Sequence, residues 1–271
     1  MKHNILIFNM TWTEYSARTS GGSTPVLLPV GALEQHGPHL PMNCDTLIPG
    51  AVCQQVAGRI DALVAPPLSY GYKSQPRSGG GNHFPGTTSL DGNTLVMMTR
   101  DIIKEFARHG VRKVAVVVGH TENLMFTIEG CDLALRDLRS QGIRDLRIVH
   151  MGYWEFSSEQ TLRKVFPDGF PSWNLEHAGV METSIMLHLH PNLVQFDKVP
   201  LHPPADFPPY DIYPVEPHRI PSSGALSSAK TATADKGRLM LDEYIETISM
   251  ALIDEFGAES FSRPDKQEQT L

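Results

Sequence analysis

Two short clusters of acidic and histidine residues, Glu-Gln-His at 34–36 and His-Thr-Glu at 120–122, are the part of this chain best equipped for chemistry. Each directly follows an apolar run that is typical of a buried β-strand, and Asp45 lies nine residues after His36. Because parallel α/β sheets place their ligand sites at the carboxyl ends of the strands, we expect these side chains to gather at one edge of a sheet. The chemistry that they favour is metal-assisted hydrolysis.

Alternation along an extended segment predicts that the outer residues of each cluster point the same way. Glu34 and His36 should therefore converge on one site, and so should His120 and Glu122. Asp45, at the start of the next expected helix, is placed to bridge them. Three carboxylates and two imidazoles suit Zn²⁺ or Mn²⁺ rather than a thiolate site. Five ligands exceed the need of one tetrahedral zinc with an open position, so they favour two metal ions that share Asp45.

Two other interpretations of these residues are open from sequence. A single Glu-x-His or His-x-Glu pattern is a weak motif that also occurs in loops without a metal. A structural metal is the second alternative, but such sites are normally closed and rich in cysteine and histidine. Repetition of the pattern at two equivalent strand ends, together with Asp45, favours the catalytic interpretation.

Composition and charge exclude several classes of protein. The chain has 271 residues, 41% of them apolar, which is enough for one large α/β domain. Its net charge is −7 and no stretch is rich in lysine and arginine, so we expect no nucleic-acid partner. No apolar run reaches the length of a membrane span and no signal-peptide pattern is present, so we expect no membrane partner. Three widely spaced cysteines indicate a reducing cytoplasm.

The order of the expected elements predicts an α/β fold in which helices connect the strands of a parallel sheet. Expected strands cover 25–30, 62–65, 113–118 and 146–150, and expected helices cover 45–57, 91–108, 123–139, 176–189 and 229–256. A long glycine-rich loop at 69–90 is expected to be functional.

We expect one domain over residues 1–271, with a polar, frayed tail at 260–271. Eight prolines at 200–221 exclude regular structure and predict an extended arm. This arm is expected to pack on the surface of its own chain or against another subunit.

Several segments of the chain resemble the creatininase family. Around the clusters they are 31–39, 43–45 and 119–123, and elsewhere they are 70–74, 78–92, 176–177, 182–184 and 226–232. The resemblance runs from about residue 11 to residue 256 with little shift in register. It implies a three-layer fold with a central, mainly parallel sheet, a cytoplasmic homohexamer, and a dinuclear centre of Zn²⁺ and/or Mn²⁺.

The implied reaction is the reversible hydrolysis of creatinine to creatine by water that the metal pair activates. The resemblance implies that one metal is held by Glu34, Asp45 and His120, and the other by His36, Asp45 and Glu122. It also implies catalytic roles for Glu122 and for His177, the proton shuttle. The implied substrate-binding residues are Ser78, Thr121, Trp154, Trp173, Asn174 and Glu182, with Trp173 on a mobile lid.

Residue chemistry is consistent with these implied roles. The ordinary pKa of a histidine such as His177 suits proton transfer to a leaving nitrogen. Tryptophan walls suit a flat, guanidinium-like substrate through stacking and cation–π contact. From sequence alone, packing in the core is an equally good account of Trp154 and Trp173.

Two positions depart from the creatininase pattern. Thr121 stands where the family has a tyrosine that touches substrate, and Asn174 stands where it has an aspartate after the lid tryptophan. Because polar groups that contact a substrate discriminate strongly, the reaction class is expected to persist while the substrate stays open. The alternatives to creatinine are another small lactam, a formamide or a cyclic ketone. A catalytically silent metal-binding scaffold is the alternative that is not an enzyme.

Overall fold

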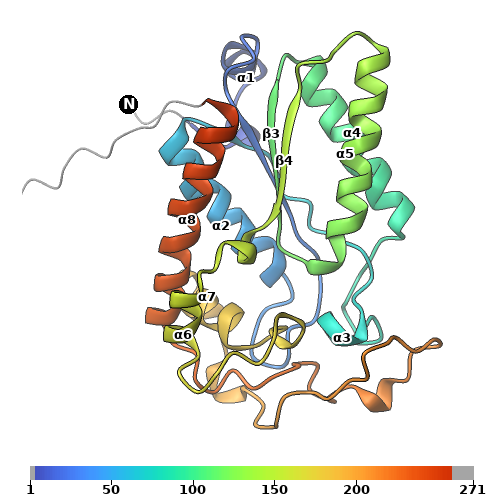
Figure 1. The fold of residues 1–271 in the computed structure, drawn as a ribbon, viewed down its shortest axis with the longest axis vertical. Helices are drawn as coiled ribbons and strands as arrows, with labels where there is room; N and C mark the ends of the chain where they lie inside the picture. The colour runs from blue at the N-terminus through green and yellow to red at the C-terminus, as the bar shows by residue number, and fades with distance from the viewer. Residues whose placement is uncertain (1–3, 258–271) are drawn as a thin grey trace, which may run out of the picture.

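A four-stranded parallel sheet lies at the centre of the computed structural model, which describes residues 4–257 (Figure 1). The strands are β1 (Val26–Val30), β2 (Leu63–Val64), β3 (Lys113–Val118) and β4 (Arg147–Gly152), in the order β2-β1-β3-β4. All four predicted strands are present, and each pairs in parallel with its neighbours. The predicted α/β class with a parallel sheet is confirmed.

Helices cover both faces of this sheet, which gives the fold three layers (Figure 1). On one side lie α2 (Cys44–Ile60), α7 (Val180–Leu189) and α8 (Ala234–Phe256). On the other side lie α4 (Gly92–Arg108) and α5 (Leu124–Ser140). Two hydrophobic cores therefore flank the sheet, and both are built largely from aliphatic side chains.

The central strand β3 shows why the sheet forms at this place in the chain. Val114, Val116 and Val118 face the core beneath α4 and α5. Ala115 and Val117 face the opposite core, beneath α2 and α8. Valine has a branched Cβ that packs well on a pleated surface, so a run of this kind favours a strand that is buried on both faces.

The remaining elements are short and lie mostly between the main helices and strands. They are the helices α1 (Trp12–Thr19), α3 (Pro76–Gly79) and α6 (Glu159–Val165), and the 3₁₀ turns Ile7–Asn9, Thr121–Asn123, Tyr153–Phe156, Trp173–Leu175, Pro191–Leu193, Phe196–Lys198 and Pro217–Arg219. Within residues 4–257 no helix has the length and apolar character needed to cross a bilayer. The predicted frayed tail at 260–271 lies outside the described residues, and a single domain stays a prediction.

Two helices begin later than the sequence pattern predicted. α7 starts only after Gly179, because Ala178 has a left-handed φ of 53° that a right-handed helix cannot contain. α8 starts after Thr233, whose extended backbone and side chain cap the helix. Because α7 begins late, residues 176–178 lie in a loop, and Glu176 and His177 of this loop line the pocket at the carboxyl ends of the strands.

The carboxyl ends of β1 and β3 lie side by side, since Val30 pairs with Val118. A glycine follows each strand, and the backbone carbonyl of Asp45 lies against both. A Cβ would lie 2.4 Å from Asp45 O at Gly31 and 2.3 Å from it at Gly119. The start of α2 can therefore sit between the two strand ends only because neither glycine has a side chain.

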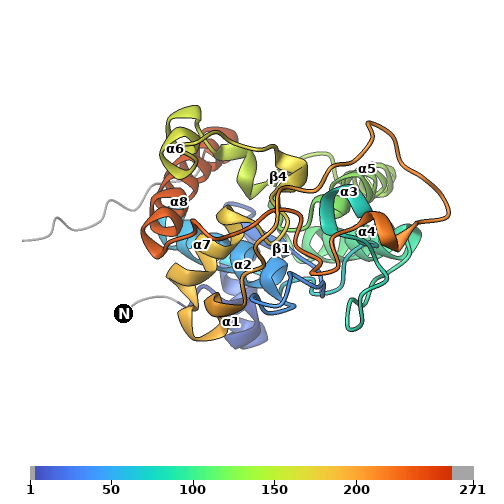
Figure 2. The ribbon, with the colours of Figure 1, turned by 90° about the horizontal axis from the view of Figure 1, so that it is seen from below.

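The proline-rich segment at 200–221 is irregular, as predicted, except for the 3₁₀ turn Pro217–Arg219, and it passes beside α3 at one end of the molecule (Figure 2). The Tyr213 hydroxyl donates a hydrogen bond to Gln75 Oε1 at 2.9 Å, and Arg77 lies 3.6 Å from the Asp211 carboxylate. The segment thus packs on its own chain. A contact with another subunit stays a prediction.

Replacement of Gly31 by alanine is expected to destabilise the fold at the start of α2. The added Cβ would lie 2.4 Å from Asp45 O and 2.7 Å from the Cα of Thr46, and backbone atoms cannot move aside as a flexible side chain can. We expect a loss of about 3 kcal/mol in the free energy of unfolding, measured by denaturant titration.

Gly58→Ala is the matched control, because Gly58 lies exposed in the same helix α2 and has no atom within 4 Å of an added Cβ. This substitution should stabilise the protein by about 0.5–1 kcal/mol through better helix propensity. Similar effects of the two substitutions would contradict the close contact between Gly31 and the backbone at the start of α2.

Candidate metal centre and active-site pocket

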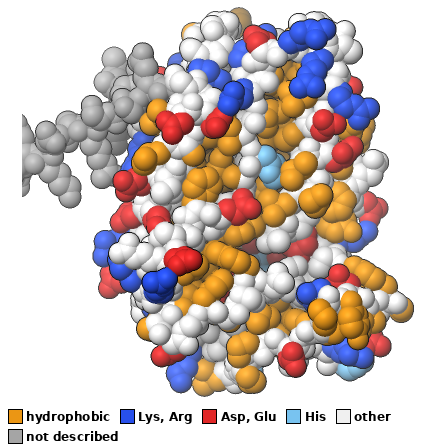
Figure 3. All heavy atoms as spheres, viewed as in Figure 1, with side chains coloured by type: hydrophobic (Ala, Val, Ile, Leu, Met, Phe, Trp, Pro, Cys, Tyr) orange, Lys and Arg blue, Asp and Glu red, His pale blue; other side chains and the backbone are white. Residues whose placement is uncertain are grey.

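A pocket opens beyond the carboxyl ends of β1 and β3. Figure 3 shows a recess in this face with acidic side chains inside it. Every predicted site residue except His36 lines the pocket, and His36 is buried against Asp45. The lining also includes four residues to which sequence reasoning assigned no role in the site, namely Gly119, Tyr153, Glu176 and Met181.

Two groups of three potential ligands share Asp45. In the first group, Nδ1 of His120 lies 3.1 Å from Glu34 Oε2 and 3.1 Å from Asp45 Oδ2. In the second group, Nε2 of His36 lies 3.0 Å from Asp45 Oδ1 and 3.6 Å from Glu182 Oε1. Asp45 therefore presents one oxygen to each group, which is the arrangement expected of a bridging ligand.

The carboxylates within 4.0 Å of His36 Nε2 in this second group are those of Asp45 and Glu182. The assignment of Glu122 to the same metal ion as His36 stays a prediction. Glu122 lies beside His120, with Oε2 3.4 Å from His120 Nδ1, so these two side chains converge as predicted. They do so although the chain turns into the 3₁₀ turn Thr121–Asn123 directly after β3.

Glu122 is held in place by donors from the glycine-rich loop. The Ser78 hydroxyl donates to Glu122 Oε1 at 2.6 Å, and the backbone N–H of Gln75 donates to the same oxygen at 3.0 Å. Gly79 of the same loop lies close to Glu34, since a Cβ at Gly79 would lie 2.3 Å from Glu34 Oε1. The absence of a side chain at Gly79 therefore lets the loop pack against the site. The other oxygen of Glu122 is left free to face His120 and the pocket.

Three ligand atoms at the centre are buried and make no hydrogen bond of good geometry, although two of them lie within 3.1 Å of an ion-pair partner. They are Glu34 Oε1, His36 Nε2 and Asp45 Oδ2, on residues that are no more than 3% exposed. Burial of adjacent carboxylates costs several kcal/mol unless cations compensate for their charge. The donor types and their unpartnered atoms therefore fit divalent metal ions that accept oxygen and imidazole nitrogen.

The protein groups by themselves balance this buried charge through shifted pKa values. Burial raises the pKa of Glu34 to about 8, although His120 opposes the shift. Burial acts in the same direction on Asp45, but His36 and His120 hold the pKa of Asp45 well below its usual value. Against the effect of burial, neighbouring carboxylates raise the pKa of both histidines. Bound cations would replace these protons, because metals bind carboxylates and neutral imidazoles.

His177 lies beside the ligand groups, on the loop before α7. Its Nδ1 is 3.8 Å from Glu34 Oε2, and its ring centroid is 4.4 Å from that of His36. Burial, assisted by the charge of His36, holds the pKa of His177 well below its usual value. Sequence reasoning did not assign a role to Gln35, whose Nε2 lies 2.9 Å from His177 Nε2. Its position inside a ligand cluster was the available signal.

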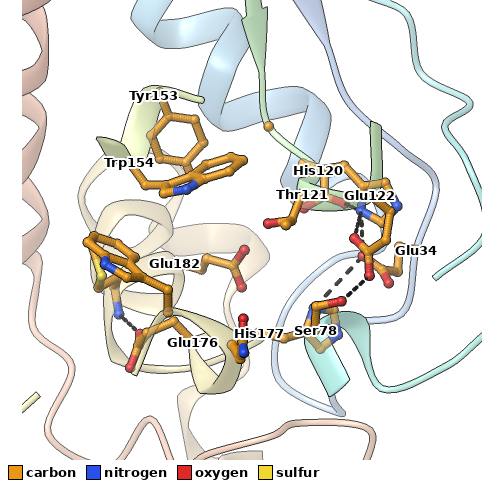
Figure 4. Close-up of a pocket in the computed structure, with 15 residues that line it drawn as sticks. Glu34, Ser78, His120, Thr121, Glu122, Tyr153, Trp154, Glu176, His177 and Glu182 are labelled. Carbon is orange, nitrogen blue, oxygen red and sulfur yellow. Dashed lines mark hydrogen bonds and ion pairs between the residues drawn. The ribbon is translucent and has the colours of Figure 1, made fainter. Parts of the chain in front are cut away.

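Aromatic side chains form the wall opposite the carboxylates. Figure 4 shows Tyr153 and Trp154 across the pocket from His120 and Glu122. Trp154 also packs against both cores, so the core and pocket interpretations both hold for it. Trp173 lines the pocket and is 43% exposed, which excludes a core role. The mobility of its segment stays a prediction.

Three further predicted residues also lie in the pocket. Thr121 and Asn174 are exposed to it as neutral polar side chains. Glu182 accepts a hydrogen bond from the Ala178 N–H at 2.6 Å through Oε2, which leaves Oε1 for the second ligand group. Glu176 accepts from the Met181 N–H at 2.8 Å, and burial raises its pKa to about 8.

Comparison with known proteins places these features in a family context. The creatininase family, described as creatinine amidohydrolase, matches residues 8–252. Creatinine amidohydrolase of Pseudomonas putida is 54% identical over 257 residues, which cover 94% of this chain and 99% of that protein. Two solved structures, a manganese creatininase and a Zn–Zn form of a glutamate-to-glutamine creatininase variant, have TM-scores of 0.92 and 0.93. Each is 54% identical and covers 94% of this chain and 99% of its own.

The ligand group seen beside His36 and the predicted one lead to opposite expectations for Glu182 and Glu122. Glu182→Gln should lower bound Zn²⁺ from two ions per chain towards one, because the second group loses a charged oxygen next to His36. Glu122→Gln, the matched control, should retain two ions. Metal content after dialysis, measured by inductively coupled plasma mass spectrometry, distinguishes them. Loss of zinc from the Glu122 variant alone would restore the ligand set first expected.

Proposed function

Because this chain belongs to the creatininase family, we propose that it is a metal-dependent amidohydrolase that interconverts creatinine and creatine. The single observation that carries the proposal is the pair of ligand groups that share Asp45 at the floor of the pocket. His177 lies directly beside these groups, and aromatic side chains stand opposite them. The amidohydrolase class thus rests on the site as well as on the family.

The proposed cofactors are two divalent ions, Zn²⁺ and/or Mn²⁺, the metals named for the related structures. The residues proposed to hold them are Glu34, Asp45 and His120 for one ion and His36, Asp45 and Glu182 for the other. When bound, such a pair polarises a carbonyl and lowers the pKa of a bound water. Glu122 is outside both groups, which leaves it available for proton transfer.

Hydrolysis of creatinine adds water across the ring amide. The carbonyl carbon gains an oxygen, the C–N bond breaks, and the ring nitrogen gains a proton. Glu122 is suited to accept a proton from the water, because Ser78 and Gln75 fix its Oε1 while Oε2 faces the pocket. His177 is suited to give a proton to the leaving nitrogen.

The walls of the pocket suit a small, flat substrate. Trp154 and Trp173 offer aromatic faces that can stack against a planar guanidino ring and exclude water from it. Among residues 4–257, no lysine or arginine lines the pocket. A substrate with an extended anionic group would therefore find no lysine or arginine partner among these lining residues.

A second candidate function keeps the metals and changes the substrate. Thr121 and Asn174 both face the pocket, and neither offers an aromatic ring or a charge. These two side chains favour a related amide substrate, such as another small lactam or a formamide, or a cyclic ketone that is opened by hydrolysis. The groups proposed to hold the metals would serve all of these substrates.

We also propose a homohexamer located in the cytoplasm. Large apolar side chains on the proline-rich segment are strongly exposed in the isolated chain, with Leu201 at 76%, Tyr210 at 62% and Tyr213 at 70%. Exposed apolar groups of this kind mark contact surfaces. The cysteines are buried and free, which suits a reducing compartment. Sedimentation equilibrium would measure the assembly directly.

Metal-loaded protein is expected to convert creatinine to creatine. Removal of the metals with a chelator should lower the rate by about 100-fold or more, because the water then keeps its ordinary pKa. Addition of Zn²⁺ or Mn²⁺ should restore it. Chromatographic assay of creatine, alongside a panel of small lactams, measures the outcome. Absence of creatinine turnover by protein that holds two metals would refute the proposed substrate.

Thr121→Tyr combined with Asn174→Asp tests whether these positions set the substrate. If they have redirected specificity away from creatinine, the double variant should gain about tenfold or more in kcat/KM for it. The two single variants are the controls, because a shared pocket wall should make their effects non-additive. An unchanged kcat/KM in the double variant would show that neither position discriminates.

A further inference from the structure

Gln35 lies between two proposed ligands, yet its side chain joins three other segments of the chain. Its Oε1 accepts a hydrogen bond from the Gly37 N–H at 2.9 Å. Its Nε2 donates towards the carbonyl oxygens of Gly79 at 3.1 Å and Gly224 at 3.0 Å. This orientation is forced, because the reverse would place Oε1 against two carbonyl oxygens.

The amide group also has no room to turn. A Cβ at Gly224 would lie 1.9 Å from Gln35 Oε1, and a Cβ at Gly80 would lie 2.8 Å from Gln35 Nε2. Both glycines have a left-handed backbone, with φ of 81° and 76°. Gln35 is only 8% exposed, so surrounding backbone fixes the direction of its N–H bonds.

The third neighbour of this amide nitrogen is His177, whose Nε2 lies 2.9 Å away. An amide nitrogen donates hydrogen bonds and does not accept them. A proton on His177 Nε2 would therefore point at an N–H group. The two amide hydrogens must serve three acceptors, so one of them is shared.

We propose that Gln35 is a positioning residue that fixes the tautomer of His177, with Nε2 as hydrogen-bond acceptor and the proton on Nδ1. The nitrogen that carries the proton is then the one that lies 3.8 Å from Glu34 Oε2, on the side of the ligand groups. The opposite tautomer would turn a lone pair towards that side. The catalytic consequence rests on the proposed function, in which His177 gives a proton to the leaving nitrogen.

The tautomer can be measured without reference to activity. Zinc-loaded protein labelled with ¹⁵N-histidine gives imidazole nitrogen shifts that separate protonated from unprotonated nitrogens, and a His177→Asn sample identifies the signals of His177. In the unsubstituted protein we expect an unprotonated Nε2 and a protonated Nδ1. A protonated Nε2 would overturn the proposal.

Gln35→Glu puts a carboxyl oxygen where the amide nitrogen lies. When this carboxyl is protonated, its O–H can donate to the carbonyl oxygen of Gly79 or Gly224, and its oxygen can accept from His177 Nε2–H. We expect the proton of His177 to move to Nε2 in this variant. An unchanged pattern of nitrogen shifts would show that Gln35 does not select the tautomer.

Kinetics test the catalytic consequence. Gln35→Glu and the apolar Gln35→Met should each lower kcat for creatinine by about 100-fold while KM stays within about twofold. Both variants should retain two metal ions, because the Gln35 side chain makes no hydrogen bond to the residues proposed to hold them. A change confined to KM would overturn the positioning role.

Thr87→Val is the matched control for loop geometry. Thr87 Oγ1 accepts a hydrogen bond from the Gln35 backbone N–H at 3.0 Å. This variant therefore disturbs the backbone of Gln35 but leaves its side-chain amide unchanged. Its kcat should stay within about twofold of the unsubstituted value. A loss equal to that of Gln35→Met would assign the effect to the loop and overturn the proposal.

Different results would refute the proposed function and the proposed role of the His177 tautomer in catalysis. Metal-loaded protein that shows the expected nitrogen shifts but does not turn over creatinine would refute the proposed function and leave the tautomer assignment intact. Active protein whose Gln35→Glu variant shows the moved proton but keeps its kcat would refute the role of the tautomer in catalysis.

Discussion

The position of the Asp45 backbone between Gly31 and Gly119 is the constraint on which the rest of the site depends. Its backbone carbonyl touches both strand ends at a distance that excludes any Cβ, and Pro49 of the same helix also lies against Gly119. The same residue turns its carboxylate outwards, with one oxygen towards His36 and the other towards His120. The sheet thus fixes the central ligand through the backbone rather than through its side chain.

A buried cluster of carboxylates and imidazoles around that ligand can be stable only if positive charge compensates for it. Without metal ions the two histidines supply that charge, and their raised pKa values reflect it. Divalent ions do the same while leaving the imidazoles neutral, which is the form in which histidine binds metals. This electrostatic requirement connects the fold to the proposed chemistry, since the most strongly buried charges are those with unpartnered atoms.

Glycines around the pocket have a shared role, which is to let backbone approach polar side chains closely. Gly79 allows the loop before it to reach Glu34, and Gly80 and Gly224 enclose the amide of Gln35. The segment 34–36 consequently serves two purposes at once. Its outer residues face the ligand groups, and its middle residue contacts His177. Under the proposed function, these three adjacent residues would couple metal binding to the position of the proton on His177.

The sequence by itself determined the strands and the chemical types at their ends. β3 follows from its run of β-branched residues, and its bounds match the prediction because neighbouring residues decide such a pattern. Only the tertiary structure decided which side chains meet. Glu182 stands beside His36 because α7 packs next to α2, and Ser78 meets Glu122 because the glycine-rich loop packs against the turn after β3. Local periodicity contains no information about contacts between residues that are more than a hundred positions apart, since packing of whole elements sets those distances.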